Sequence, residues 1–161
     1  MNIAIIFAGG TGQRMGTEIP KQFLKIDRKP IIIHTIEKFE KNENIDAIII
    51  SCLETWIPKL EKLVKQYNIK KVKSIIPGGE TGQLSIFNGI NTAYKMFPKE
   101  SIVLIHDGVR PFIDNNLINE NIKTTKEKGS AISCVKSTET FTIINENMDI
   151  IKIPKRSESL V

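Results

Sequence analysis

The sequence predicts an α/β protein with a mainly parallel sheet, and two observations lead to that fold class. Short apolar runs lie at residues 2–7, 45–51, 72–76, 102–105 and 131–135, and segments with helical periodicity lie between them at residues 30–39, 56–67, 85–97 and 115–128. The chain has 161 residues, 40% of them hydrophobic, which is enough for one compact domain with a core. Strands that alternate with helices favour a parallel sheet with helices on both faces.

The individual elements follow from local patterns. Residues 2–7 (NIAIIF) are almost continuously apolar, as in a strand buried on both faces. Pro30 stands at the first turn of the helix expected over residues 30–39. Residues 56–67 place their apolar side chains on one helical face, and Asp and Asn ahead of the helix expected at 115–128 are capping signals.

Two short β-like runs, residues 141–144 and 150–153, flank a polar segment at 145–149 and predict a hairpin. An isolated hairpin is marginally stable in water, so it needs a surface to pack on. The residues leave two alternatives open: the hairpin lies at the edge of the same domain, or it projects as an arm that pairs with another subunit.

Composition excludes several classes of protein. The formal charge is +5, but Lys and Arg are spread along the chain, and no dense basic tract is interleaved with aromatic residues. We therefore expect a small anionic substrate and no nucleic acid. No apolar run approaches the roughly 20 residues that span a bilayer, so we expect no membrane partner. The N-terminal apolar run lacks a preceding basic region, which predicts a cytoplasmic protein without a signal peptide.

Cysteine and histidine residues are too few and too scattered to predict a metal cluster or a disulfide framework. Cys52 and Cys134 are expected to be buried small apolar residues and not nucleophiles. His34 is expected on a helix surface. His106 is expected to be a structural histidine, with the orientation of Asp107 as the alternative role.

The first motif is a glycine-rich string at residues 8–16 (AGGTGQRMG), which follows the first expected strand. Glycines let the backbone approach a phosphate and direct N–H groups toward it. Arg14 and Lys21 add two cations, which could hold a triphosphate and offset charge at a reacting phosphorus. The alternative is a glycine-rich turn with two solvated bases. The candidate phosphate-binding residues of the string are Ala8, Gly9, Gly10 and Gly12.

Two further motifs follow later strands. Asp107, in the string IHDGVRP, could hold Mg²⁺, and Arg110 could bind a second anionic group; the alternative is a buried ion pair between these two residues that fixes a turn. Residues 77–85 (PGGETGQLS) form a glycine-rich loop that suits a flat base or a phosphate. Ser85 either contacts the base or caps the following helix.

In this order the motifs resemble those of the cytidylyltransferases that activate polyol phosphates. The matching strings are residues 8–24, 29–36, 78–85 and 106–111. The resemblance implies a Rossmann-like, three-layer nucleotidyltransferase fold, with one domain over residues 1–161. It also implies a homodimer in which the hairpin (residues 139–155) is the dimerisation arm. Members of the family continue past Val161, so we expect the chain to lack the family's C-terminal portion.

The resemblance also implies roles for individual residues. The glycine string and Arg14 would hold the phosphates of CTP, and Lys21 would stabilise the transition state. Gly79 and Ser85 would contact the cytosine, and Asp107 would help to hold Mg²⁺.

The acceptor side is implied in the same way. Arg110 and Thr138 would lie beside the polyol phosphate, and Arg156 would reach the substrate of the neighbouring subunit. The implied reaction transfers CMP from CTP to a polyol phosphate and releases pyrophosphate. The strings VRPF and IPKR look more like the ribitol 5-phosphate branch than the methylerythritol phosphate branch.

Three alternatives to this function stay open. They are the methylerythritol phosphate enzyme of isoprenoid synthesis, a truncated non-catalytic nucleotide-binding module, and a sugar-1-phosphate nucleotidylyltransferase. The last of these shares the glycine opening but does not predict the string HDGVRP.

Overall fold

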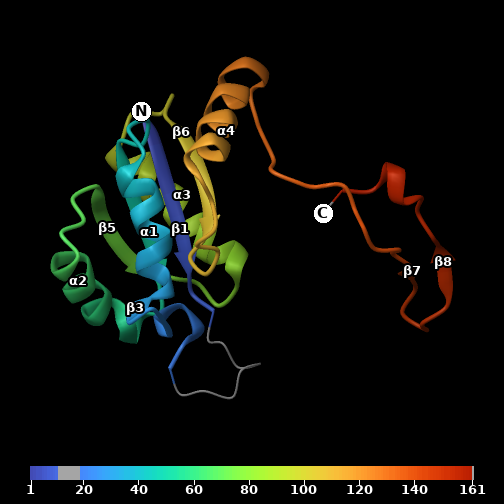
Figure 1. Cartoon of the computed structure of the whole chain (residues 1–161), viewed down its shortest axis with the longest axis horizontal. Coiled ribbons are helices and arrows are strands. Elements are labelled where there is room, and N and C mark those ends of the chain that lie inside the picture. Colours follow the sequence, from blue (N-terminus) through green and yellow to red (C-terminus); the bar gives the residue numbers. More distant parts are fainter. Residues whose placement is uncertain (11–18, 161) are drawn as a thin grey trace.

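The computed structural model of the chain describes residues 1–10 and 19–160. These residues form a main sheet of four parallel strands: β1 (Asn2–Ala8), β4 (Ala47–Cys52), β5 (Val72–Pro77) and β6 (Ile102–Asp107). The strand order is β5-β4-β1-β6. Figure 1 shows β5 and β6 on opposite sides of β1. The chain therefore extends the sheet to one side of β1 and later returns to the other side with β6. Ligands of open α/β sheets bind at the carboxyl ends of strands beside such a reversal.

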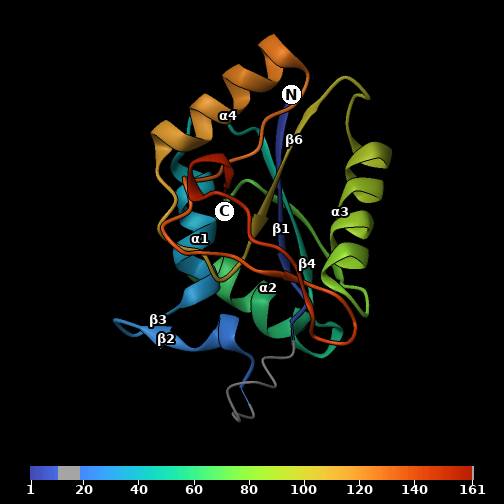
Figure 2. The same ribbon diagram turned by 90° about the vertical axis from the view of Figure 1, so that its right-hand side faces the viewer.

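Helices cover both faces of the sheet, as expected (Figure 2). The elements α1 (Ile31–Lys41), α2 (Ile57–Gln66) and α4 (Asn115–Lys128) pack on one face, and α3 (Gly82–Met96) packs on the other. Along β1, Ala4 and Ile6 face the first layer, whereas Ile3 and Ile5 face α3. All six residues of the inner strand β4 are buried, which explains its continuous apolar run.

Small residues let α3 lie close to the sheet. A Cβ atom at Gly89 would collide with Cγ2 of Ile5, and it would lie 3.3 Å from Oγ of Ser51. Ser51, near the end of β4, also donates to the carbonyl of Ser85 at 2.7 Å, so the start of α3 lies at the carboxyl end of the sheet.

The helix boundaries refine several expectations. α3 begins at Gly82 and not at residue 85, because Thr81 is its N-cap and accepts a hydrogen bond from the N–H of Leu84. Asp114 caps α4 by accepting from the N–H of Leu117 at 2.8 Å, which confirms the capping signal. α1 begins one residue after Pro30, so this proline is the N-cap.

The expectation of a fifth strand at residues 131–135 is wrong. Within the described part of the chain this segment pairs with no strand, and the side chains of Ile132 and Val135 are strongly exposed, Ile132 at 89%. The segment leads away from α4 toward the hairpin (Figure 1). Apolar composition alone does not make a strand, because a strand requires a neighbour that pairs with its N–H and C=O groups.

The predicted hairpin is confirmed, with shorter strands than expected. β7 (Ile143–Ile144) and β8 (Ile150–Lys152) pair antiparallel in a sheet of their own, separate from the main sheet. The N–H of Ser137 donates to the carbonyl of Ser159 at 3.0 Å and closes the base of this segment. The hairpin lies apart from the body of the domain (Figure 1), which is the geometry of a projecting arm and not of an edge hairpin.

Three short 3-10 helices complete the described residues: η2 (Lys21–Phe23), η3 (Glu54–Trp56) and η4 (Arg156–Glu158). A second small hairpin, β2 (Lys25–Ile26) with β3 (Lys29–Pro30), follows η2. Among the described residues, no helix has both the length and the apolar character needed to cross a bilayer.

Candidate active site

The three motifs meet at the carboxyl edge of the main sheet. β1 leads into Gly9 and Gly10, β5 leads into Gly78, and β6 ends at Asp107. Phe7 and Asp107 are register partners, so the glycine string and the carboxylate leave neighbouring strands at the same level. The expected phosphate contacts of Gly12 and Arg14 lie outside the described residues.

Two glycine turns approach each other around one serine side chain. A Cβ atom at Gly9 would lie 2.7 Å from Oγ of Ser85, and a Cβ atom at Gly78 would lie 2.9 Å from the same oxygen. Any larger residue at either position would displace this hydroxyl group. Glycine is therefore required here for close approach, and the turns after β1 and β5 form one continuous backbone surface.

The hydroxyl group of Ser85 is fully engaged inside this surface. Ser85 is 1% exposed, and its Oγ accepts a hydrogen bond from the N–H of Gly79 and donates to the carbonyl of Thr81, both at 3.0 Å. From β4, Ser51 donates to the carbonyl of Ser85 at 2.7 Å. The alternative in which Ser85 caps α3 is wrong, because Thr81 occupies that position. Contact of Gly79 and Ser85 with cytosine stays a prediction.

Asp107 has one carboxylate oxygen committed to its own turn. Its Oδ1 accepts from the N–H of Val109 at 3.0 Å, and its Oδ2 lies 3.7 Å from Nε of Arg110. The ion pair of the alternative interpretation therefore exists, but it is not buried, because the side chain of Arg110 is 78% exposed. An exposed pair of this length is weak, so both side chains stay available to a ligand.

Two side chains donate hydrogen bonds to the backbone of the turn that follows Asp107. Thr35 of α1 is fully buried, and its Oγ1 donates to the carbonyl of Gly108 at 2.9 Å. His106 donates from Nε2 to the carbonyl of Arg110 at 2.9 Å. Burial lowers the pKa of His106, and the hydrogen bond to Arg110 and the charge of Asp107 oppose this shift only in part. His106 is thus a structural histidine, as expected.

The donor set at this edge fits Mg²⁺ when a phosphate ligand supplies the rest of the coordination. The described residues contain no group of three or more His, Cys, Asp or Glu side chains that could enclose a metal ion. Mg²⁺ is commonly bound by one or two carboxylates together with substrate phosphates and water. Asp107, whose side chain is partly exposed, provides one such carboxylate.

Lys21 lies on η2, close to the glycine string in the fold, with an exposed side chain. The next residue, Gln22, is a site residue that the sequence analysis missed. It is 2% exposed, and its Nε2 donates to the carbonyls of Ala8 at 2.6 Å and Gly10 at 3.1 Å. Thr35 was missed as well. Both side chains bond to main-chain carbonyls of distant turns, and such partners leave no signal in residue spacing.

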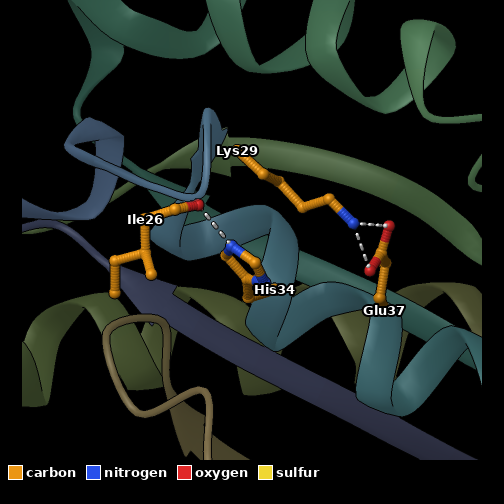
Figure 3. Close-up of polar contacts among 4 residues, drawn as sticks. All are labelled: Ile26, Lys29, His34 and Glu37. Carbon is orange, nitrogen blue, oxygen red and sulfur yellow. Dashed lines mark hydrogen bonds and ion pairs between the residues drawn. The ribbon is translucent and has the colours of Figure 1, made fainter.

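The segment after η2 is joined to α1 by two side-chain contacts. Figure 3 shows His34 of α1 donating from Nε2 to the carbonyl of Ile26 at 3.0 Å. It also shows Nζ of Lys29 paired with both carboxylate oxygens of Glu37, at 2.8 and 2.9 Å. His34 thus faces the surface of its helix, as expected, and ties the β2–β3 hairpin to it.

Two expected acceptor residues do not join this edge. Thr138 lies in the exposed segment before the arm, and Arg156 lies on η4 beyond it, also exposed. Figure 1 shows this part of the chain away from the carboxyl edge of its own sheet. Their roles toward the polyol phosphate stay predictions.

The two cysteines differ in environment. Cys52 is buried at the end of β4, as expected, and burial raises the pKa of its thiol to about 11. Cys134 is exposed, so the expectation that it is buried is wrong. The cause is the failed strand at residues 131–135, because the burial of Cys134 depended on that pairing.

Fold and site together define a Rossmann-like α/β protein in which two glycine turns and one carboxylate lie at the carboxyl edge of the sheet. The model of the 2-C-methyl-D-erythritol 4-phosphate cytidylyltransferase family (IspD) matches residues 2–160. The chain belongs to this family.

Individual relatives agree with the family match. A ribitol-5-phosphate cytidylyltransferase of Vibrio parahaemolyticus is 54% identical over 153 residues, which cover 94% of this chain and 64% of the relative. One of Streptococcus agalactiae is 46% identical and covers 100% of this chain and 68% of the relative. A 2-C-methyl-D-erythritol 4-phosphate cytidylyltransferase of Clostridium botulinum is 39% identical, and the match covers 99% of this chain and 69% of the relative.

A solved structure is similar as well. The 4-diphosphocytidyl-2C-methyl-D-erythritol synthase of Anaerococcus prevotii superposes with a TM-score of 0.80 at 25% identity, over 99% of this chain and 66% of that chain. The chain thus spans about two thirds of the length of the relatives that it matches.

Proposed function

We propose that the chain is the catalytic portion of a cytidylyltransferase that transfers CMP from CTP to ribitol 5-phosphate. The observation that carries the proposal is the similarity over nearly the whole chain to ribitol-5-phosphate cytidylyltransferases, at 54% and 46% identity. The assembled carboxyl edge supports it, because glycine turns, an exposed lysine and a partly exposed carboxylate gather where a nucleoside triphosphate would bind.

In the proposed reaction, an oxygen of the polyol phosphate attacks the α-phosphorus of CTP in line. A new P–O bond forms, the bond from the α-phosphorus to the bridging oxygen breaks, and pyrophosphate leaves. The N–H groups of the glycine turn after β1 bind the phosphates, and the ammonium group of Lys21 offsets the charge that builds up at phosphorus. Arg14 is proposed to share this role.

Asp107 would help to hold Mg²⁺, and the N–H of Val109 fixes one of its carboxylate oxygens. When bound, the ion neutralises and orients the triphosphate. Gly79 and Ser85 are proposed on the cytosine side, and Arg110 on the acceptor side.

We propose further that the protein is a cytoplasmic homodimer assembled through the arm. Exposed apolar side chains of β7 and β8 support this proposal: Ile143, Ile144, Ile150 and Ile151. Exposed apolar side chains on a projecting hairpin are typical of an interaction surface. In such a dimer, Arg156 of η4 is proposed to serve the site of the neighbouring subunit. Thr138 is proposed on the polyol phosphate side.

A second candidate is cytidylyl transfer to 2-C-methyl-D-erythritol 4-phosphate. The description of the matching family model and the relative at 39% identity favour it. The lower identity of that relative makes ribitol 5-phosphate the first choice.

The test is pyrophosphate release from CTP and Mg²⁺ with each polyol phosphate in turn. The assay uses the 161-residue chain and, beside it, the full reading frame that contains it. Release with ribitol 5-phosphate supports the proposal, and release with methylerythritol phosphate alone supports the second candidate. Absence of release with both acceptors from the full reading frame would contradict the enzymatic function. If the protein still bound CTP in that case, the remaining function would be that of a non-catalytic nucleotide-binding module.

A further inference from the structure

Gln22 is a buried polar side chain that the proposed reaction does not use. It lies between the exposed Lys21 and the buried Phe23 on η2. Its amide group has two N–H donors, and Nε2 has two acceptors within reach, the carbonyls of Ala8 at 2.6 Å and Gly10 at 3.1 Å. The side chain therefore spans the first turn of the glycine string on the side that faces η2.

These hydrogen bonds orient the backbone of the string. In a trans peptide the C=O and N–H groups point in opposite directions. Because the carbonyl of Ala8 is directed at Gln22, the N–H of Gly9 points away from Gln22. The carbonyl of Gly10 is held on the same side as that of Ala8. Carbonyl oxygens repel phosphate oxygens, so a phosphate-binding backbone must turn them away from the ligand.

The turn that carries Gln22 is itself anchored. The ring of Phe23 stacks on that of Trp56 with a centroid distance of 4.5 Å, and the N–H of Phe23 donates to the carbonyl of Pro20 at 2.8 Å. Gln22 thus joins a turn fixed against η3 to the end of β1. The same turn carries Lys21, so one set of contacts sets the distance between the lysine and the glycine string.

We propose that Gln22 is a positioning residue. It holds the carbonyls of Ala8 and Gly10 away from the phosphate side of the glycine string, and it keeps Lys21 at a fixed distance from this string. The inference rests on the proposed function. It assigns a role to a residue whose own side chain does not reach substrate, because both of its amide protons are directed at the backbone.

The test compares two buried amides. Gln22→Met removes the donors and keeps an unbranched side chain of similar size. Asn42→Leu is the matched control: Asn42 is 3% exposed, and its Nδ2 donates to Oδ1 of Asn115 and Asn119, both at 3.1 Å. It lies before β4, at the opposite edge of the sheet from the glycine string. Gln22→Met leaves the carbonyls of Ala8 and Gly10 without this donor. Asn42→Leu leaves Oδ1 of Asn115 without this donor and the N–H of Asn44 without its acceptor, so both variants are expected to lower Tm.

Two measurements distinguish positioning from general stability. In the nucleotide-free chain labelled with ¹⁵N, the amide signals of Gly9 and Gly10 shift and exchange faster with Gln22→Met, and they stay in place with Asn42→Leu. Calorimetry with CTP and Mg²⁺ gives a Kd raised about tenfold by Gln22→Met and unchanged by Asn42→Leu, since a tenfold loss corresponds to one misaligned hydrogen-bonded contact.

The outcomes separate the inference from the proposed function. If Gln22→Met lowers Tm but leaves the two glycine signals and the Kd as in the unchanged chain, the positioning role is overturned. If the unchanged chain does not bind CTP, the proposed function fails. The amide signals of Gly9 and Gly10 then test alone whether Gln22 orients the backbone of the glycine string. Unchanged signals in that case overturn the inference too.

Discussion

The hydroxyl group of Thr35 donates a hydrogen bond of 2.9 Å to the main-chain carbonyl of Gly108, across 73 positions of the sequence. Gly108 follows directly on Asp107, and its own N–H donates to the carbonyl of Phe7 at 2.9 Å. The turn that presents the carboxylate is thus held between α1 and β1. The position of Asp107 depends on a threonine in the core.

Thr35→Val tests this dependence. Valine keeps the shape of the side chain but leaves the buried carbonyl of Gly108 without its donor, so we expect the free energy of unfolding to fall by about 1–2 kcal/mol. Urea titration measures the change. Thr35→Ser retains a hydroxyl group and is expected to lose less. A valine variant as stable as the unchanged chain would show that the hydrogen bond contributes nothing.

Gly9 and Ser85 are expected to be coupled. Gly9→Ala places a methyl group 2.7 Å from Oγ of Ser85 and should destabilise the chain, while Ser85→Ala leaves the N–H of Gly79 without its acceptor. In the double variant the methyl group added at position 9 has no oxygen to collide with, and the next atom, Cβ of residue 85, lies at 3.7 Å.

The loss of stability in the double variant is therefore expected to be smaller than the sum of the two single losses, by about 1 kcal/mol. A thermodynamic cycle from denaturant unfolding measures this difference. Strict additivity would contradict the close approach of the two glycine turns.

Lys21→Ala is expected to abolish most turnover and leave the fold intact. The side chain is exposed, so its removal costs the core nothing, whereas loss of one charge at the transition state commonly lowers kcat about 10²- to 10³-fold. Pyrophosphate release measures the rate, and circular dichroism checks the fold. Lys123→Ala, at an exposed position of α4, is the control. Equal rates for the two variants would remove Lys21 from the mechanism.

The buried thiol of Cys52 predicts a decline of stability at alkaline pH. Burial raises its pKa from 9.0 to about 11. Between these values the folded state keeps a proton that the unfolded state has lost, so the free energy of unfolding falls as pH rises. Denaturant titrations at several pH values measure the slope. Cys52→Ala has no such group and should show a shallower decline; an identical slope would contradict the burial of the thiol.

If the protein dimerises through the arm, a charged substitution on the arm should prevent dimerisation. Ile151 of β8 is exposed, and Ile151→Glu puts a charge on the arm that would be buried in a dimer. We expect light scattering to show monomers, with the fold of the main domain unchanged. Met96→Glu, at an exposed position of α3, is the control. If the unchanged chain is itself a monomer at micromolar concentration, the proposed dimer is wrong for this chain.

Local signals predicted much of the fold. The apolar run of β4, the helical face of α2 and the cap at Asp114 act within a few residues, so the sequence shows them directly. The order of motifs along the chain, together with the rule that parallel strands share one carboxyl edge, was enough to bring the glycine turns and Asp107 together. The hairpin was visible for the same reason, because its strands adjoin one turn.

Features that depend on backbone groups distant in sequence could not be predicted from local signals. Residues 131–135 have the composition of a strand, yet the described chain offers them no pairing partner, and Cys134 is exposed as a consequence. Gln22 and Thr35 looked like ordinary polar residues, since their partners are carbonyl groups 12 to 14 and 73 positions away.

The sequence by itself determined the α/β class, the family and the end of the sheet at which the motifs gather, because periodicity and glycine turns are local properties of a chain. The tertiary structure decided that Ser85 lies buried between two glycine turns, that Gln22 and Thr35 hold the two loops, and that the arm stands apart from the main sheet. These features depend on the packing of α1, α3 and η2 against strands distant in sequence. A buried hydrogen bond forms only where that packing brings donor and acceptor within reach.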